Sequence, residues 1–310
     1  MLSKRSVRLA IILLLTICVT AIIVSALRWR GATPLRRVDV GHDGLGLAVL
    51  DDGSLVVAGT QQVTGWTATG QRRRFEIEVE EPIASIVAGQ GGRCYVLDEE
   101  GGLLCFDDKG QTVAARAKNV SPIQCLAFRN GRLAAVSDQK LIWLDPITLR
   151  AAEPEPTLLS GPASVLDHCD GLVCVGNFLA EELQFLEGQD AWTVPIERVG
   201  AVEISTDGNW VAAVTWRGEV VLIDRVQRAI AWRKELTWTG EMRSVRFSPG
   251  GDHLVTCSPV RGRVWVLARE TGESLLESAV GGDPVVVNFL TSGDVVALHA
   301  DGDLRWWAVK

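Results

Sequence analysis

Residues 245–257 read VRFSPGGDHLVTC, and the architecture of the protein can be inferred from this segment. Its two ends are short runs in which apolar residues alternate with polar ones, as in half-buried β-strands. Between them, Gly250 and Gly251 supply the left-handed backbone that a tight hairpin turn requires. The stretch therefore predicts a two-stranded antiparallel hairpin.

The same turn signal recurs seven times, each time between two apolar, β-rich runs. Its second position is a glycine in every case, namely Gly53, Gly91, Gly131, Gly171, Gly208, Gly251 and Gly293. Successive glycines are 37 to 43 residues apart, with a mean spacing of 40. One such turn would be a weak signal, but seven at even spacing indicate a repeat architecture.

Each repeat continues with a second pair of β segments. After the hairpin at 245–257, the pattern predicts strands at 263–267 and 274–277. The preceding repeat shows the same order at 202–204, 210–214, 219–223 and 229–233. Four strands in about 40 residues are one blade of a β-propeller. The sequence therefore predicts an all-β, seven-bladed β-propeller.

The last repeat offers only three strands, at 285–289, 295–299 and 304–309. The segment Arg37–Val40, ahead of the first hairpin, is an unassigned β segment of the right length. We expect it to pair with 304–309 and close the ring, because closure removes an exposed sheet edge. The propeller then spans residues 37–310.

The N-terminal segment has a different character. Residues 9–27 (LAIILLLTICVTAIIVSAL) carry no charge, and as a helix they would span ~28 Å, close to the ~30 Å hydrocarbon core of a bilayer. We expect a transmembrane signal anchor, with a basic flank at 1–8 and a linker at 28–36. A signal peptide cleaved after the small residues 24–26, giving a secreted domain, is the alternative. Cations flank both ends of the segment, and we expect the propeller on the extracytoplasmic side.

The charge distribution argues against nucleic-acid binding. The first thirty residues hold five cations and no acid, so the other 26 Lys and Arg face 38 Asp and Glu, a formal charge of −12. Non-specific nucleic-acid binding needs clustered Lys and Arg that displace counterions. We therefore expect no nucleic-acid partner.

The repeats resemble those of the WD-repeat propellers. The likeness is best at 245–251 (VRFSPGG) and 263–267 (RVWVL), with Gly41-His42 at the position of that family's Gly-His dipeptide and Trp-Leu-Asp at 143–145 similar to its Trp-Asp end. Only one blade carries Gly-His. The Asp–His–Ser/Thr–Trp network that the resemblance implies is therefore mostly missing, and blade stability must depend on apolar packing.

The fourth strands are similar to quinoprotein-type propeller repeats instead. Residues 270–273 read ETGE, and Asp224 is followed eight positions later by Trp232. Tryptophans also recur at equivalent positions. We expect those on third strands to pack between blades (Trp66, Trp143, Trp265 and Trp306), and we place Trp192 and Trp232 on fourth strands.

Motifs for catalysis, cofactors and metals are missing. There is no G-x-S-x-G elbow, no P-loop and no C-x-x-C. The four histidines, His42, His168, His253 and His299, fall at non-equivalent positions, so we interpret them as surface or turn residues. We expect no metal and no cofactor.

Two pairs of cysteines flank turns. Cys94 with Cys105, and Cys169 with Cys174, could form disulfides if the domain lies in an oxidising compartment. The alternative is that these cysteines are buried free thiols that serve as small apolar residues.

One face of the predicted ring is acidic. In a propeller, the turns between second and third strands and the loops between blades lie on the same face. The acidic residues there are Asp43, Glu80, Glu81, Asp98, Glu99, Glu100, Asp138, Glu181, Glu182, Glu241, Asp283 and Asp301, against Lys140, Arg217 and Arg261. We predict that this loop face binds a protein or peptide partner, with Trp238 as an anchor. The alternative is a set of ordinary solvated turns.

The combined prediction is a non-catalytic, membrane-tethered scaffold. One alternative is a small quinoprotein-like or hydrolase propeller enzyme with a ligand in the central channel, near Glu203, Arg246 and Asn288 on first strands. Another is a structural subunit of an envelope complex. On the opposite face, Arg72–Arg74 would either contact anionic headgroups or cover an outer edge strand with charge.

Overall fold

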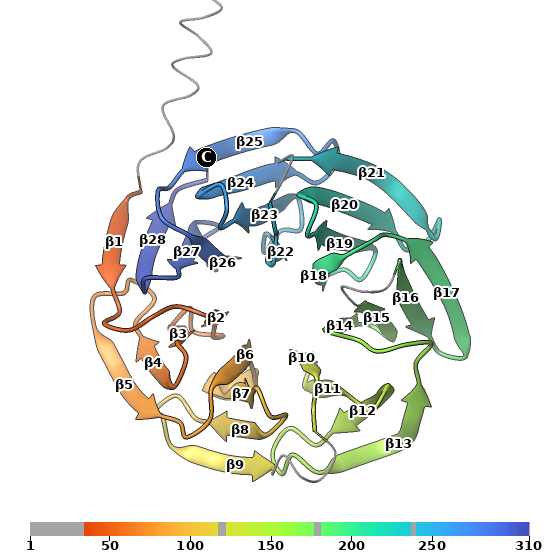
Figure 1. Cartoon of the computed structure of the whole chain (residues 1–310), viewed down its shortest axis with the longest axis horizontal. Coiled ribbons are helices and arrows are strands. Elements are labelled where there is room, and N and C mark those ends of the chain that lie inside the picture. The colour runs from red at the N-terminus through yellow and green to blue at the C-terminus, as the bar shows by residue number, and fades with distance from the viewer. Residues whose placement is uncertain (1–33, 117–121, 177–180, 237–239, 310) are drawn as a thin grey trace, which may run out of the picture.

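Seven antiparallel sheets of four strands stand around a central axis, each with its first strand innermost and its fourth strand at the rim (Figure 1). The computed structural model describes residues 34–116, 122–176, 181–236 and 240–309. The prediction of an all-β, seven-bladed β-propeller is confirmed.

The blades follow one another around the ring in chain order, except that β1 is the outer strand of the last blade. Blade 1 holds β2 (Gly46–Val49), β3 (Leu55–Ala58), β4 (Gln62–Trp66) and β5 (Arg73–Glu78); blade 2 holds β6 (Ile83–Ala88), β7 (Cys94–Asp98), β8 (Leu103–Phe106) and β9 (Thr112–Arg116). Blade 3 holds β10 (Cys125–Arg129), β11 (Arg132–Ser137), β12 (Lys140–Leu144) and β13 (Ala151–Leu158); blade 4 holds β14 (Val165–Cys169), β15 (Leu172–Gly176), β16 (Glu182–Glu187) and β17 (Asp190–Pro195). Blade 5 holds β18 (Val199–Ile204), β19 (Trp210–Thr215), β20 (Glu219–Asp224) and β21 (Ala229–Glu235); blade 6 holds β22 (Val245–Phe247), β23 (His253–Ser258), β24 (Arg263–Ala268) and β25 (Ser274–Ala279). Blade 7 holds β26 (Pro284–Phe289), β27 (Val295–His299), β28 (Asp303–Trp307) and β1 (Arg36–Asp39).

The glycines that mark the period are turn residues. All seven have a positive φ, between 68° and 86°. In blades 3 and 4 the residue before the glycine, Asn130 or Asp170, also has a positive φ, which is the backbone of a type I′ hairpin turn. In blade 2 the turn is instead a short 3-10 segment, Gln90–Gly92.

The N-terminal strand closes the ring, as predicted. β1 pairs antiparallel with β28, so that Val38 lies opposite Leu304 and Arg36 opposite Trp306. Arg37 adds an ion pair with the buried Asp303. The strand begins at Arg36, one residue before the predicted boundary.

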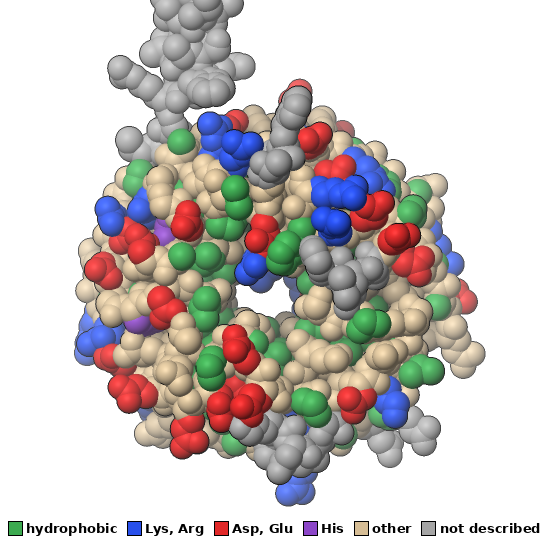
Figure 2. Space-filling view, viewed as in Figure 1, with side chains coloured by type: hydrophobic (Ala, Val, Ile, Leu, Met, Phe, Trp, Pro, Cys, Tyr) green, Lys and Arg blue, Asp and Glu red, His purple; other side chains and the backbone are tan. Residues whose placement is uncertain are grey.

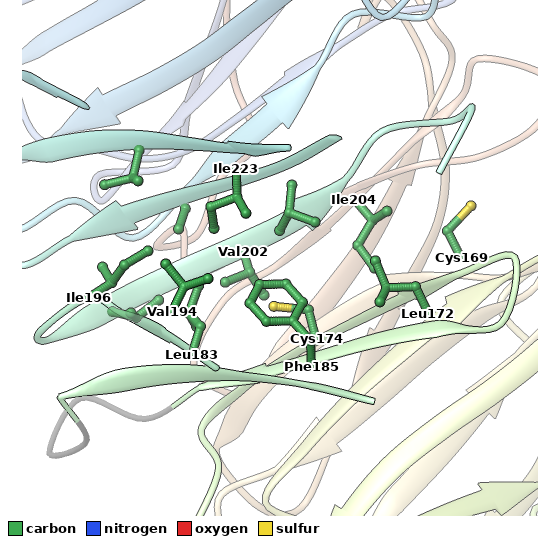
Figure 3. Packing of buried hydrophobic residues seen from close by; sticks show 14 residues of the cluster. Cys169, Leu172, Cys174, Leu183, Phe185, Val194, Ile196, Val202, Ile204 and Ile223 are labelled. Atoms are coloured by element: carbon green, nitrogen blue, oxygen red, sulfur yellow. The ribbon is translucent and has the colours of Figure 1, made fainter. Parts of the chain in front are cut away.

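Apolar packing between blades holds the ring together. The buried side chains form seven clusters, and each cluster is shared by two neighbouring blades. In the cluster between blades 4 and 5, Cys174 and Phe185 pack against Ile204 and Ile223 (Figure 3). The tryptophans of the third strands belong to such clusters, as expected for Trp66, Trp143, Trp265 and Trp306.

The Gly-His dipeptide ahead of blade 1 takes part in a polar contact with that blade. The Nε2 atom of His42 lies 2.9 Å from the hydroxyl of Thr64, and the indole nitrogen of Trp66 donates to the same hydroxyl at 2.9 Å. The first of these contacts joins the loop before β2 to β4, the third strand of the blade, and the second lies within β4.

The possible disulfides are not formed: all six described cysteines are buried and free. Cys94 lies opposite Phe106, whereas Cys105 lies opposite Tyr95, so the two thiols point to opposite faces of blade 2. Cys169 and Cys174 share a face but are diagonal neighbours, since Cys169 pairs with Leu172. Diagonal neighbours are about 7–8 Å apart, beyond the usual Cα separation of a disulfide.

Two histidines are core residues, which corrects the prediction that all four lie at the surface or in turns. His168 is 5% exposed and contacts Trp143 edge-on, with ring centroids 5.0 Å apart. His299, at the end of β27, is fully buried, and burial beside Arg305 lowers its pKa to about 4. His168 is the residue before the last of β14 and His299 is the last of β27, but each side chain is buried.

The predicted signal anchor at 9–27 lies outside the described residues, as does most of the linker. Within the described ranges, no helix has the length and apolar character needed to cross a membrane.

Ring closure can be tested by truncation. We compare chains that begin at residue 34 and at residue 41. The shorter chain lacks β1, exposes the edge of β28 and loses Val40 from the core between blades 7 and 1. We expect its melting temperature to fall by at least about 5 °C and its tendency to associate to rise, because an open edge can pair with another chain. Calorimetry and size-exclusion chromatography measure both, and equal melting of the two chains would contradict the closure role of β1.

Candidate functional site

The first strands of the blades enclose a central cavity of about 310 Å³. The ring is open at its centre when viewed along the axis (Figure 2). Blades 1 and 2 line the cavity with apolar residues, at 47–49 and 86–88. The other blades add the polar side chains Arg129, Asp167, Glu203, Arg246 and Asn288. The polar side chains of the channel therefore all come from blades 3 to 7, next to apolar residues of the first strands.

Sequence reasoning proposed three of these five residues. Glu203, Arg246 and Asn288 all line the cavity, whereas Arg129 and Asp167 were missed. Both missed residues lie on first strands, β10 and β14. Applying the same first-strand criterion to blades 3 and 4 would have found them.

Arg129 is the centre of the charged side. Its guanidinium lies 3.6 Å from the carboxylate of Asp167 and 3.7 Å from that of Glu203, and it donates to the carbonyl of Ile204. Burial by itself would lower the pKa of Arg129, but the two carboxylates raise it above its ordinary value. Arg129 is thus a fully charged residue whose partners come from blades 4 and 5.

The two carboxylates connect neighbouring blades through backbone hydrogen bonds. Asp167 of blade 4 accepts from the amide of Ile204 in blade 5 at 2.7 Å, and Glu203 of blade 5 accepts from the amide of Phe247 in blade 6. A carboxylate that accepts amide hydrogen bonds satisfies donors that no strand partner reaches. Asp167 and Glu203 therefore have a structural role in the ring.

Glu203 is unusual in its proton affinity. Burial raises the pKa of this carboxyl to about 7, although the nearby Arg246 and Arg129 act in the opposite direction. Its side chain is only 15% exposed, which explains why desolvation dominates. Glu203 can therefore take up or release a proton near neutral pH.

Arg246 and Asn288 differ from the other three residues because they keep free hydrogen-bonding capacity. Arg246 donates through Nη1 to the carbonyl of Val245 at 2.9 Å, and its charge acts on the nearby Glu203, whose pKa it lowers against the effect of burial. The side-chain amide of Asn288 makes no hydrogen bond to another described residue. In the described part of the chain, no group of three or more His, Cys, Asp or Glu side chains could hold a metal ion.

A second hollow lies between blades 1 and 2, with a volume of about 630 Å³. We call it the blade 1–2 groove. Its floor is apolar and includes Ile77, Val96 and Leu104. Its lining also includes acidic side chains, Glu78, Glu80, Glu81 and Asp98, with Arg116 as a cation. The groove thus combines an apolar floor with a mainly acidic border.

The other acidic residues of the predicted loop face are not gathered into one patch. Glu181 and Glu182 line a separate hollow of about 600 Å³ on blade 4, and Glu241 is paired with Arg243. Asp and Glu side chains are spread around the ring when the molecule is viewed down its axis (Figure 2). Trp238 lies outside the described residues. The remaining members lie on turns or blade-joining loops, namely Asp43, Glu99, Glu100, Asp138, Asp283 and Asp301.

Arg72–Arg74 lies at the start of the outer strand of blade 1. Arg74 pairs with Asp52 at 3.0 Å and with Asp108 of blade 2 at 2.9 Å, and Arg73 pairs with Glu76 at 2.7 Å. These contacts within the ring favour the interpretation that the run covers an edge strand.

Comparisons with known proteins support the fold and one of the resemblances. Residues 23–167, a little under half of the chain, are similar to a family described as outer membrane protein assembly factor BamB. The match supports the quinoprotein-like resemblance, and the WD-repeat assignment is not confirmed. No curated protein matches the chain.

Two solved structures share the architecture. "Crystal Structure of Mitotic Checkpoint Complex" contains a chain that is 15% identical, with a TM-score of 0.76 over 90% of this chain and 95% of that one. "KlHsv2 with loop 6CD replaced by a Gly-Ser linker" is 13% identical, with a TM-score of 0.65 over 84% of this chain and 90% of that one. At these identities the likeness concerns the fold alone.

The charged cluster predicts a large effect of Arg129→Met. The substitution leaves Asp167 and Glu203 buried without their shared cation, so we expect a loss of about 3 kcal/mol in the free energy of unfolding. Urea denaturation measures this loss. Arg150→Met, at an exposed residue in the connection after β12, is the control and should stay within about 0.5 kcal/mol of wild type. Equal stabilities of the two variants would rule out the structural role of Arg129.

Glu203 predicts a specific pH dependence. Its folded-state pKa of about 7 lies above the ordinary value, so the protonated form favours the fold, and this contribution is lost as the pH rises towards 7. Between pH 5 and pH 8 the wild type should lose roughly 2 kcal/mol that Glu203→Gln does not lose. Urea titrations at both pH values provide the comparison, and parallel pH profiles would exclude the raised pKa.

Proposed function

We propose that this protein is a non-catalytic scaffold, tethered to a membrane by residues 9–27, that binds a protein partner in the blade 1–2 groove. The observation that carries the proposal is the groove itself, because it joins an apolar floor to an acidic border. Glu80, Glu81 and Asp98, three residues of the predicted acidic loop face, line it.

The groove defines the chemistry of the partner. Side chains such as Ile77 and Leu104, which are only partly buried, offer apolar surface, worth about 25 cal/mol per Å² when a partner covers it. The acidic border favours Lys or Arg on the partner and speeds the encounter more than it adds affinity. We therefore propose a partner segment that carries apolar residues flanked by cations.

The family similarity supports a place in the cell envelope. The matched family is described as an assembly factor for outer membrane proteins. This description is consistent with a scaffold on the extracytoplasmic side of a membrane. It also favours the related alternative of a structural subunit in an envelope complex, which would copurify in fixed stoichiometry after detergent extraction.

An enzyme with its active site in the channel is supported less well. The charged residues there are engaged in contacts between blades, as shown by Arg129 and its partners Asp167 and Glu203. Glu203 titrates near neutral pH, but its carboxylate is already held by Arg129 and by the amide of Phe247, so it is not positioned by these contacts to act on a substrate. Arg246 and Asn288 remain available, and they are donors rather than nucleophiles.

Photo-crosslinking in cells tests the docking site. A photoreactive amino acid is placed at Leu104 in the groove or, as the control, at Val226, which is 73% exposed on the turn after β20. We expect a discrete crosslinked protein from position 104 only. Glu80→Lys should reduce its yield at least fivefold, because it places a cation at the acidic border. Equal crosslinking from both positions, or no effect of Glu80→Lys, would refute the proposed site.

A further inference from the structure

We propose that the partner segment binds as a fifth strand of blade 2, paired along the outer edge of β9, with alternate side chains over the blade 1–2 groove. This inference rests on the proposed function, because it concerns the same groove, and it adds the conformation of the partner. The observations that carry it are the open edge of β9, the small side chains of that strand and the charge of the groove.

β9 is the outermost strand of blade 2. Within the described ranges it pairs with β8 alone, so its second edge has no strand partner there. In an antiparallel pair, every second residue directs its N–H and C=O groups away from the partner strand. These groups are the donors and acceptors with which a further strand can pair.

β9 lacks the features that discourage pairing on the other outer strands. Each of the other six outer strands contains at least one acidic residue, and β13 and β17 contain proline as well. Charged side chains and proline at an edge disfavour the addition of a strand. β9 reads TVAAR, and its single charge, Arg116, is its last residue, where Nη1 donates to the carbonyl of Leu149 at 3.2 Å. β9 is therefore the outer strand most open to another chain.

The neighbouring edge, β5, is a poor alternative. β5 precedes β9 along the rim of the ring (Figure 1). Four of the six residues of β5 are charged, and Arg74 joins this strand to Asp52 and Asp108. A segment that enters the groove thus finds one edge covered by charge and one edge that is uncharged over its first four residues.

Side chains of β9 extend the groove to the open edge. Thr112 and Ala115 line the groove and lie opposite Phe106 and Leu104 of β8. Residues that lie opposite each other in adjacent strands share one face of the sheet, so the floor of the groove continues to the outermost strand. Both β9 side chains are small and exposed, which leaves room for larger side chains from an added strand. Alternate side chains of that strand lie beside them, on the groove side.

The charge of the groove selects cations on the partner. Glu78, Glu80 and Asp98 line the groove, whereas the guanidinium of Arg116 is held at the carbonyl of Leu149. Lys or Arg on the groove-facing side of the added strand is attracted to this lining, and Asp or Glu is repelled. The partner is therefore an extended segment whose groove-facing residues are apolar in the middle and basic at both ends.

A synthetic peptide tests strand addition. The probe is acetyl-KTVTVTK-amide, because an extended chain of this sequence places both valines and both lysines on one face. Two further versions carry N-methyl groups, either on the amides of the valines or on the amides of the first two threonines. Each version removes hydrogen-bond donors from one edge of the peptide and leaves the other edge intact. We expect calorimetry with the full-length protein to show at least about tenfold weaker binding for one version and less than about twofold for the other.

Variants of the protein locate the edge. Ala115→Lys places a charge on β9 and should weaken binding of the unmethylated peptide at least about tenfold. Ala231→Lys makes the same change at an exposed residue of β21, the outer strand of blade 5, and should leave the affinity unchanged. Both variants should keep the melting temperature of the wild type, because both residues are exposed.

Equal effects of the two methylated versions, or wild-type affinity in Ala115→Lys, would overturn strand addition. If Glu80→Lys weakens peptide binding but methylation of either edge does not, the groove remains the docking site and the strand conformation is wrong. Absence of peptide binding at millimolar concentration also overturns strand addition, whereas crosslinking from Leu104 tests the groove independently of the bound conformation.

Discussion

The pairing of β1 with β28 is the constraint on which the structure depends. Each blade buries apolar side chains only against its two neighbours, so every blade needs a neighbour on both sides. An open ring would leave two blades with an uncovered face. The antiparallel register of Val38 opposite Leu304 joins the N-terminal strand to the last blade and completes the seventh shared core.

Polar contacts follow the same arrangement from blade to blade. Asp167 and Glu203 each accept an amide hydrogen bond from the next blade, and Arg74 pairs with Asp52 and Asp108 across blades 1 and 2. These contacts lie near the axis and near the rim, where the apolar clusters end. Polar contacts thus join neighbouring blades both at the channel and at the outer strands, in addition to the apolar clusters.

The proposed docking site and the channel use different parts of this architecture. The blade 1–2 groove arises where two blades fail to fill the space between their outer strands, and it suits an extended partner with apolar and basic side chains. The channel arises because seven first strands cannot meet at the axis, and Arg129 with its two carboxylates joins neighbouring blades there. Partner binding at the rim can therefore be altered without changing the charged cluster at the axis.

The repeat, the strands and the segment that closes the ring can all be predicted from the order of the amino acids. The signals for them are local: the turn glycines, the alternation of apolar and polar residues, and the unassigned segment Arg37–Val40. Each depends on the backbone preferences of a few neighbouring residues and not on the rest of the chain. The first-strand rule also placed Glu203, Arg246 and Asn288 at the channel. Contacts between side chains of different strands and blades could not be predicted in this way. The register of β7 with β8 places Cys94 and Cys105 on opposite faces of blade 2. The closed ring brings Arg129 close to carboxylates from two other blades. Such contacts depend on how strands and blades pack together, and no single repeat encodes that packing.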